Sequence, residues 1–259
     1  MAEPLRNYQT RTAPYGRADM AIDEGLRAYM LRVYNLMGMG LLITGLAAVA
    51  TIMLATTNNP AAAVATLPSG QMLTSFGYAI FASPLKWVVI LAPLAAVFFL
   101  SFRVQSMSVG AAQTTFWVYA GLVGLSLSSI FLVYTSASIT QTFFATAAAF
   151  GALSLYGYTT KRDLTAMGSF LIMGLFGLII AMVINLFLQS SALSFAVSAI
   201  GVLIFAGLTA YDTQKIKEMY YESDDAEVAG RKSIMGALTL YLDFINLFMF
   251  LLQFMGDRR

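Results

Sequence analysis

Residues 165–188 read TAMGSFLIMGLFGLIIAMVINLFL and contain no Asp, Glu, Lys or Arg. A helix needs roughly 20 mostly apolar residues to cross the hydrocarbon core of a bilayer, so this stretch predicts a transmembrane helix. Six further stretches of the same kind lie before and after it, at Leu31–Ala55, Trp87–Phe102, Gln113–Tyr134, Thr140–Tyr158, Leu193–Thr213 and Ile234–Met255. The sequence therefore predicts seven membrane-spanning helices.

The composition supports the same fold class. Hydrophobic residues make up 59% of the 259-residue chain and charged residues only 11%. Soluble domains carry about 25% charged residues, and a soluble fold of this size could not hide so much apolar surface. We therefore expect an all-α integral membrane bundle of seven helices at residues 31–259, preceded by a cytoplasmic N-terminal arm at residues 1–30.

Missing residue types narrow the chemistry. The chain has no Cys and no His, which removes zinc sites built on these residues, thiol nucleophiles, Ser-His-Asp triads and haem held by His. The net charge of +2 provides no broad basic surface for nucleic acid. We expect no required cofactor, and any proton chemistry must use Asp, Glu, Tyr, Lys or Arg.

The distribution of basic residues predicts the orientation. Apart from the N-terminal arm, Lys and Arg gather in alternate loops, at Arg103, Lys161, Arg162, Lys215, Lys217, Arg231 and Lys232. The intervening loops carry no charge apart from Lys86. Because short basic loops stay on the cytoplasmic side, we expect the N-terminus inside and, after seven spans, the C-terminus outside. The closing Asp257-Arg258-Arg259 leaves a re-entrant last segment open as the alternative.

Two acidic residues lie within apolar helices rather than in arms or loops. They are Asp212 and Asp243, and an ionisable side chain in such a place is a functional candidate by default, because burying it in hydrocarbon is costly. The last two helices should form an antiparallel hairpin whose midpoint between these residues falls within a residue of Glu227. The hairpin therefore predicts that the two carboxyl groups lie level with each other.

Two carboxylates in close contact cannot both ionise easily. The pair would hold the two helices together while it shares a proton, and losing that proton would push the helices apart or free the carboxylates to bind a cation. This is a pH switch that needs no histidine. The alternative is that each aspartate only anchors its own helix through a nearby hydroxyl or basic residue.

Arg103 is a third candidate for this site. It lies about 24 Å from Trp87 along the second predicted helix, near the expected height of Asp212. It could pair with one or both carboxylates, or extend its side chain to lipid phosphates.

The residues around both aspartates resemble the paired signatures of the Bax inhibitor family, also called the transmembrane Bax-inhibitor-motif proteins. These segments are TAYDTQKI at residues 209–216 and YLDFINLF at residues 241–248, and RAYMLRVYN at residues 27–35 resembles bacterial members. The resemblance covers the chain from about residue 22 to its end.

The resemblance implies a seven-helix bundle with the last helix at its centre. It also implies a pH-sensitive calcium leak gated by the pair Asp212 and Asp243, with Arg103 as the arginine that contacts it. The two aspartates are then the candidate contacts for a calcium ion. One departure is that Trp87–Phe102 holds no acid, so the gate is expected to persist while ion conduction is altered or lost.

Two other functions remain open. An intramembrane aspartyl protease would match Tyr211-Asp212, but its second motif carries glycines where this chain has Leu240-Tyr241-Leu242 before Asp243. A non-enzymatic regulator would bind other membrane proteins, with residues 1–30 as the natural contact. The bacterial resemblance and the absence of a signal-peptide pattern before Leu31 indicate a bacterial inner membrane.

Overall fold

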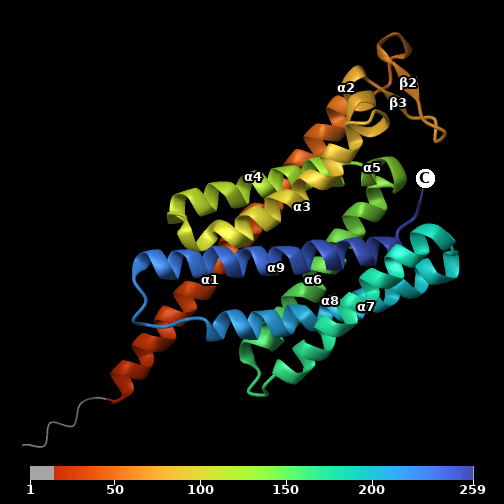
Figure 1. The fold of residues 1–259 in the computed structure, drawn as a ribbon. Helices are drawn as coiled ribbons and strands as arrows, with labels where there is room; N and C mark the ends of the chain where they lie inside the picture. Colours follow the sequence, from red (N-terminus) through yellow and green to blue (C-terminus); the bar gives the residue numbers. More distant parts are fainter. Residues whose placement is uncertain (1–14, 259) are drawn as a thin grey trace, which may run out of the picture.

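The computed structural model describes residues 15–258 of the chain, with side chains placed from Glu24 onward. Seven of its helices are long and apolar enough to cross a membrane. They are α1 (Tyr15–Ala55), α3 (Lys86–Arg103), α4 (Val109–Leu127), α6 (Ser136–Thr159), α7 (Thr165–Leu188), α8 (Ser191–Glu218) and α9 (Ala226–Met255). The short helix α5 (Ile130–Val133) continues the third span. The prediction of an all-α membrane bundle with seven spans is confirmed (Figure 1).

Local sequence signals set where several helices begin. The side-chain oxygens of Ser108, Thr135, Ser190 and Asp225 each accept a hydrogen bond from a backbone N–H in the first turn of α4, α6, α8 and α9, respectively. These N-cap bonds satisfy donors that a helix start leaves free.

The first helix, α1, begins at Tyr15 and continues without a break through residue 30, the expected border between the N-terminal arm and the membrane domain. Residues 1–14 of the expected arm lie outside the described residues.

The long connection between the first two spans has structure of its own. It contains strands β1 (Thr56–Thr57), β2 (Ala65–Thr66) and β3 (Met72–Leu73), which form an antiparallel sheet in the order β1-β3-β2. A 3-10 turn η1 (Pro60–Ala62), helix α2 (Ser75–Gly77) and a π turn η2 (Tyr78–Ala82) complete it. This small cap lies at one end of the bundle (Figure 1).

The bundle has two unlike ends. The charged end holds the start of α1 and the connections at 104–108, 160–164 and 219–225, while the charge-poor end holds the small sheet, the connections at 128–135 and 189–190, and the chain terminus. Because α9 is one uninterrupted helix, it carries the terminus across the bundle. There Thr135 N donates to Asp257 O at 3.1 Å and Asp257 N donates to Ser138 Oγ at 2.9 Å. The re-entrant alternative for the last segment was therefore wrong.

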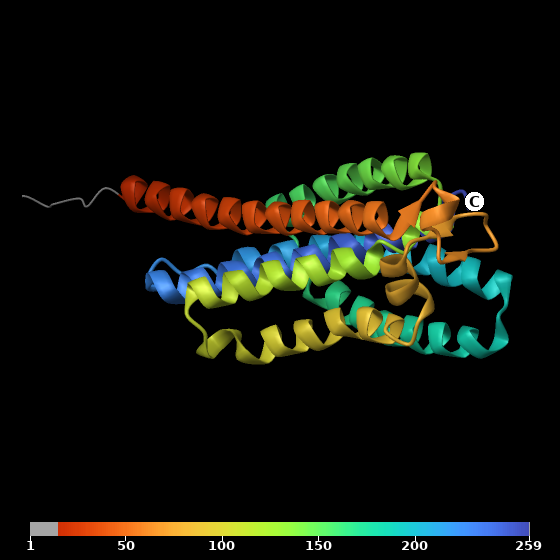
Figure 2. The ribbon, with the colours of Figure 1, turned by 90° about the horizontal axis from the view of Figure 1, so that it is seen from above.

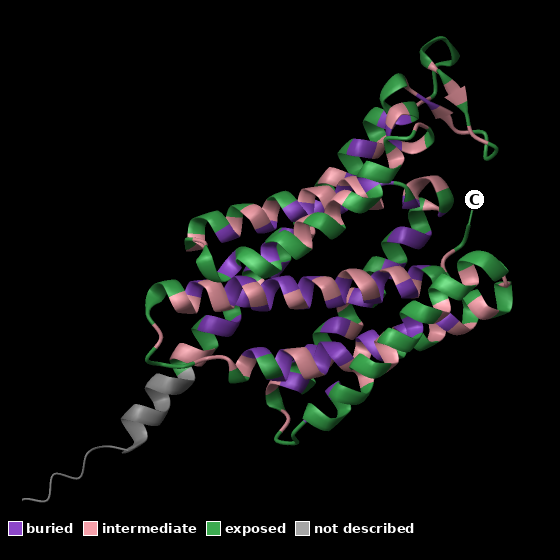
Figure 3. Cartoon of the chain, in the orientation of Figure 1, coloured by how far each residue is buried: buried purple, intermediate pink, exposed green. Residues whose placement is uncertain are grey.

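Helix α9 lies at the centre of the bundle. Of the residues in its apolar window 61% are buried, against 6% in α7, and Figure 3 shows burial concentrated along it. It packs against α1, α4, α6 and α8. The expected central position of the last helix is observed, while α3 packs mainly on α4, and α7 on α8, outside this inner group (Figure 2).

Polar contacts tie the inner helices together. The Thr44 hydroxyl of α1 lies 2.6 Å from the Tyr241 hydroxyl of α9 and 2.9 Å from the Ala120 carbonyl oxygen of α4. Helices α6 and α8 are joined by close backbone approach, because a Cβ added at Gly157 would lie 2.1 Å from Ala210 O. Small residues at such positions let helices approach closely in lipid, where the hydrophobic effect does not drive them together.

Candidate functional site

The structure brings Asp212 of α8 and Asp243 of α9 into hydrogen-bond contact through their side chains. The predicted level placement is therefore observed, but the hairpin that produces it is asymmetric. Asp212 lies six residues before the end of α8, about 9 Å, whereas Asp243 lies seventeen residues into α9, about 26 Å. The connection at 219–225 is long enough to span the difference, since an extended chain covers about 3.3 Å per residue.

The two carboxyl groups differ in their surroundings. The side chain of Asp243 is 5% exposed, and its Oδ2 receives no hydrogen bond from an N–H or hydroxyl group in the described part of the chain. Asp212 is half-buried and interacts with the positive charge of Lys215 one turn further along α8. A carboxylate only accepts hydrogen bonds, so two carboxyl groups in hydrogen-bond contact must hold at least one proton between them.

Arg103 does not join this pair. It is the last residue of α3, its side chain is exposed, and the ion pairs found within residues 24–258 are Arg231–Glu227 and Lys232–Asp224. The expected contact between Arg103 and the aspartates is therefore absent from this structure. The reason is architectural, because α3 is an outer helix that packs mainly on α4 and places its end at the surface.

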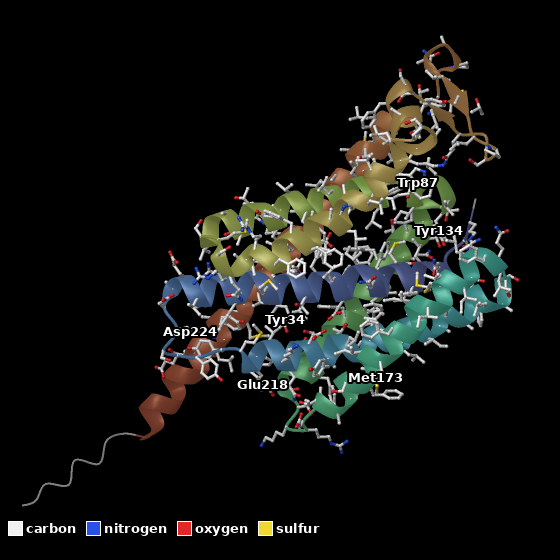
Figure 4. The ribbon with its side chains drawn as sticks, in the orientation of Figure 1. Tyr34, Trp87, Tyr134, Met173, Glu218 and Asp224 are labelled. Carbon is white, nitrogen blue, oxygen red and sulfur yellow. The ribbon has the colours of Figure 1, made fainter. Side chains whose placement is uncertain are left out.

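A chain of hydroxyl groups runs beside the aspartate pair. Tyr34 OH of α1 lies 2.7 Å from Ser154 Oγ of α6, which lies 2.9 Å from Thr213 Oγ1 of α8, next to Asp212 in sequence. Tyr34, labelled in Figure 4, is half-buried and lines a pocket together with residues of α6. Ser154 and Thr213 are buried. This connection of three helices was not predicted, because single hydroxyl residues are frequent in membrane helices and carry no signal by themselves.

Gln214 is a second residue that sequence reasoning missed. Its Nε2 donates to Arg162 O at 2.8 Å, and its Oε1 accepts from Leu164 N at 2.8 Å. The side chain thus fastens the connection between α6 and α7 onto α8, two residues from Asp212. The sequence signal that could have identified Gln214 is an amide residue two positions after Asp212 in an otherwise apolar helix.

The pair offers few ligands to a metal ion. Two carboxyl groups supply four oxygens, and within residues 24–258 no group of three or more Asp, Glu, His or Cys side chains is close enough to hold a metal. Calcium in proteins takes six to eight oxygen ligands. The arrangement therefore suits brief contact with a passing, partly hydrated cation better than tight binding.

Comparison with known proteins supplies the family. The model of the family described as "Inhibitor of apoptosis-promoting Bax1" matches residues 26–259, a range that includes both aspartates and Arg103. The chain belongs to the Bax inhibitor family. The resemblance drawn from the two aspartate motifs is thus confirmed, and it extends over all seven spans.

Bacterial relatives in this family are similar over nearly their whole length. The chain is 51% identical to an uncharacterised protein of Rickettsia prowazekii, over 96% of this chain and 98% of that one. It is 47% identical to the inner membrane protein YbhL of Escherichia coli, over 91% of this chain and 94% of that one. A protein of Caulobacter vibrioides is 45% identical over 96% of both chains. Together with the seven apolar helices, this makes the chain an integral membrane protein of the Bax inhibitor family.

Proposed function

We propose that this Bax inhibitor family protein is a pH-sensitive cation leak, with calcium as the transported ion and the Asp212–Asp243 pair as its gate. The observation that carries the proposal is the direct contact of two carboxyl groups between α8 and the central helix α9. Asp243 lies in the most buried helix of the bundle, so a change in its charge acts where all inner helices meet.

The pair works as a gate because its proton decides whether the helices attract or repel. With one proton shared, the carboxyl groups hold α8 against α9. When that proton is lost, two unit negative charges about 4 Å apart repel by about 4 kcal/mol at an effective dielectric constant of about 20. Separation of the helices, or entry of a cation between the carboxylates, relieves this repulsion. Raising the pH therefore favours the open state.

The test is calcium flux into liposomes that contain a calcium-sensitive dye and the reconstituted protein, measured between pH 6 and pH 8. We expect flux through the wild-type protein to rise with pH. Asp212→Asn and Asp243→Asn keep a hydrogen-bonding side chain but remove the shared proton, so flux through either variant should hardly change with pH. A wild-type pH profile that survives both substitutions would refute the gating role.

Asp163→Asn is the matched control. Asp163 is an exposed acid at the charged end, and hydrogen bonds from Thr165 hold its pKa below the ordinary value. It therefore stays ionised throughout the assay range. Asn keeps the oxygen that accepts from Thr165 N at 2.8 Å, so this variant should retain the wild-type profile.

We also propose that the role is non-enzymatic. A protease would have to bring a peptide to both aspartates, yet Asp243 is enclosed among packed helices and is 5% exposed. For orientation we propose that the charged end faces the cytoplasm of a bacterial cell, with the protein in the inner membrane. The support is that, of the described Lys and Arg residues, only Lys86 and Arg258 lie at the charge-poor end.

A further inference from the structure

A pocket on the side of the bundle gathers hydrogen-bond donors without an acid among its lining residues. It has a volume of about 450 Å³ and opens between α1 and α4 near the charged end. Arg32 and Asn35 of α1 line it together with Gln113 and Trp117 of α4. A guanidinium and two amides thus belong to residues that line one pocket, and the Trp117 ring completes its wall.

Within residues 24–258, these four side chains have no hydrogen-bond or ion-pair partner. The buried Nε1–H of Trp117 has no acceptor, and Arg32, Asn35 and Gln113 make no side-chain hydrogen bond or ion pair to any part of the chain from Glu24 to Arg258. A buried donor left without an acceptor costs about 1–3 kcal/mol. Arg32 and Asn35 are exposed and Gln113 is half-buried, so the donors of these three side chains are open to an acceptor from outside the chain.

The position of the pocket identifies the kind of acceptor. Trp117 lies eight residues into α4, about 12 Å from the helix start, so the pocket lies in the half of the span next to the charged end. Tryptophan is typical of the membrane–water boundary, and a long arginine side chain near a helix end extends toward it. The remaining wall includes Leu31 and Met39, which are exposed apolar side chains that an acyl chain can cover. The pocket opens toward lipid rather than toward the bundle interior.

We propose that the pocket between α1 and α4 binds the phosphate of a phospholipid headgroup, with preference for lipids of net negative charge. Arg32 supplies the charge, since a guanidinium matches two phosphate oxygens at once. Asn35 and Gln113 donate the neutral hydrogen bonds, and the Trp117 ring forms part of the pocket wall. This proposal does not depend on the proposed gate, because neither aspartate lines the pocket.

The two tryptophans allow a direct test. The chain holds only Trp87 and Trp117, and Trp87 lies at the charge-poor end (Figure 4). In a Trp87→Phe variant, quenching of Trp117 fluorescence by lipids brominated in the acyl chain reports which lipid occupies the pocket. The vesicles mix phosphatidylglycerol with phosphatidylcholine, and each lipid is brominated in turn. We expect brominated phosphatidylglycerol to be preferred over phosphatidylcholine by about fivefold at Trp117.

Substitutions then assign the preference to the pocket. Arg32→Gln should reduce it to near equality, and Gln113→Leu should weaken it. Arg162→Gln, which changes an exposed arginine at the same end, should leave it unchanged. In the reciprocal Trp117→Phe variant, quenching of Trp87 should not respond to Arg32→Gln.

Two results would overturn the proposal. One is equal quenching of Trp117 by both brominated lipids, or a preference that Arg32→Gln does not alter. The other is a saturable change in Trp117 emission when soluble glycerol phosphate is added to phosphatidylcholine vesicles, because that would show a site for free phosphate and not for lipid.

Discussion

Replacing Gly157 by alanine tests the backbone contact between α6 and α8 next to the aspartate pair. A Cβ at this position would lie 2.1 Å from Ala210 O and 3.0 Å from Ala210 Cα. Both atoms belong to the backbone, so no rotamer change relieves the overlap. Ordinary van der Waals contact begins at 3.4 Å, and α6 must move away from α8 to restore it.

The energetic cost follows from opposing effects. Overpacking of a rigid interior costs about 1–3 kcal/mol, and this contact belongs at the upper end because neither backbone can yield locally. Alanine in place of glycine gains about 1 kcal/mol in a helix interior. Moving α6 also strains the bond between Ser154 and Thr213, which is worth about 1 kcal/mol. We expect Gly157→Ala to lose about 2–3 kcal/mol of unfolding free energy.

Gly151→Ala provides the control on the same helix. A Cβ at Gly151 meets nothing within 4 Å, so only the gain in helix propensity applies there. Unfolding in mixed micelles with rising dodecyl sulfate, followed by circular dichroism, measures both variants. If their unfolding free energies agree within about 0.5 kcal/mol, the scatter expected of neutral surface changes, then α6 and α8 do not touch at Gly157 and the reasoning fails.

Two further predictions concern the charged end. Gln214→Leu removes the side-chain hydrogen bonds to Leu164 N–H and Arg162 C=O, so amide hydrogen exchange at residues 160–164 should accelerate while the rest of α8 keeps its protection. Unchanged exchange at these residues would contradict the proposed role of Gln214 in holding this connection on α8. Because the chain has no native Cys, single cysteines at Ser69 and Glu222 can report orientation. In intact cells a membrane-impermeant maleimide should label the first and not the second, and the reverse pattern would invert the topology.

Part of the site was within reach of sequence reasoning because simple constraints act on it. An acid in an apolar helix is rare, and a hairpin places residues on its two arms at related heights, so Asp212 and Asp243 can be paired from the sequence alone. Arg103 could not be placed in the same way. The sequence gives the position of Arg103 along α3. It does not show whether the side chain points toward the other helices or away from them.

The residues that support the pair depend on three helices meeting at one point. Tyr34, Ser154 and Thr213 are far apart in sequence, and each alone is an ordinary polar residue of a membrane helix. The donors around Trp117 form another such group, because α1 and α4 must lie side by side before Asn35 and Gln113 share a pocket. Helix rotation and neighbour choice decide these contacts.

The sequence by itself determined the seven spans, their alternating direction and the two level aspartates. It could do so because hydrocarbon penalises every unpaired backbone group and every charge, which leaves a clear mark on local composition. The tertiary structure alone decided that α9 is surrounded by four helices, that α3 turns Arg103 outward, and that Gln214 fastens a distant loop. These outcomes rest on packing of small residues between helices, where differences of an ångström in backbone approach select one neighbour over another.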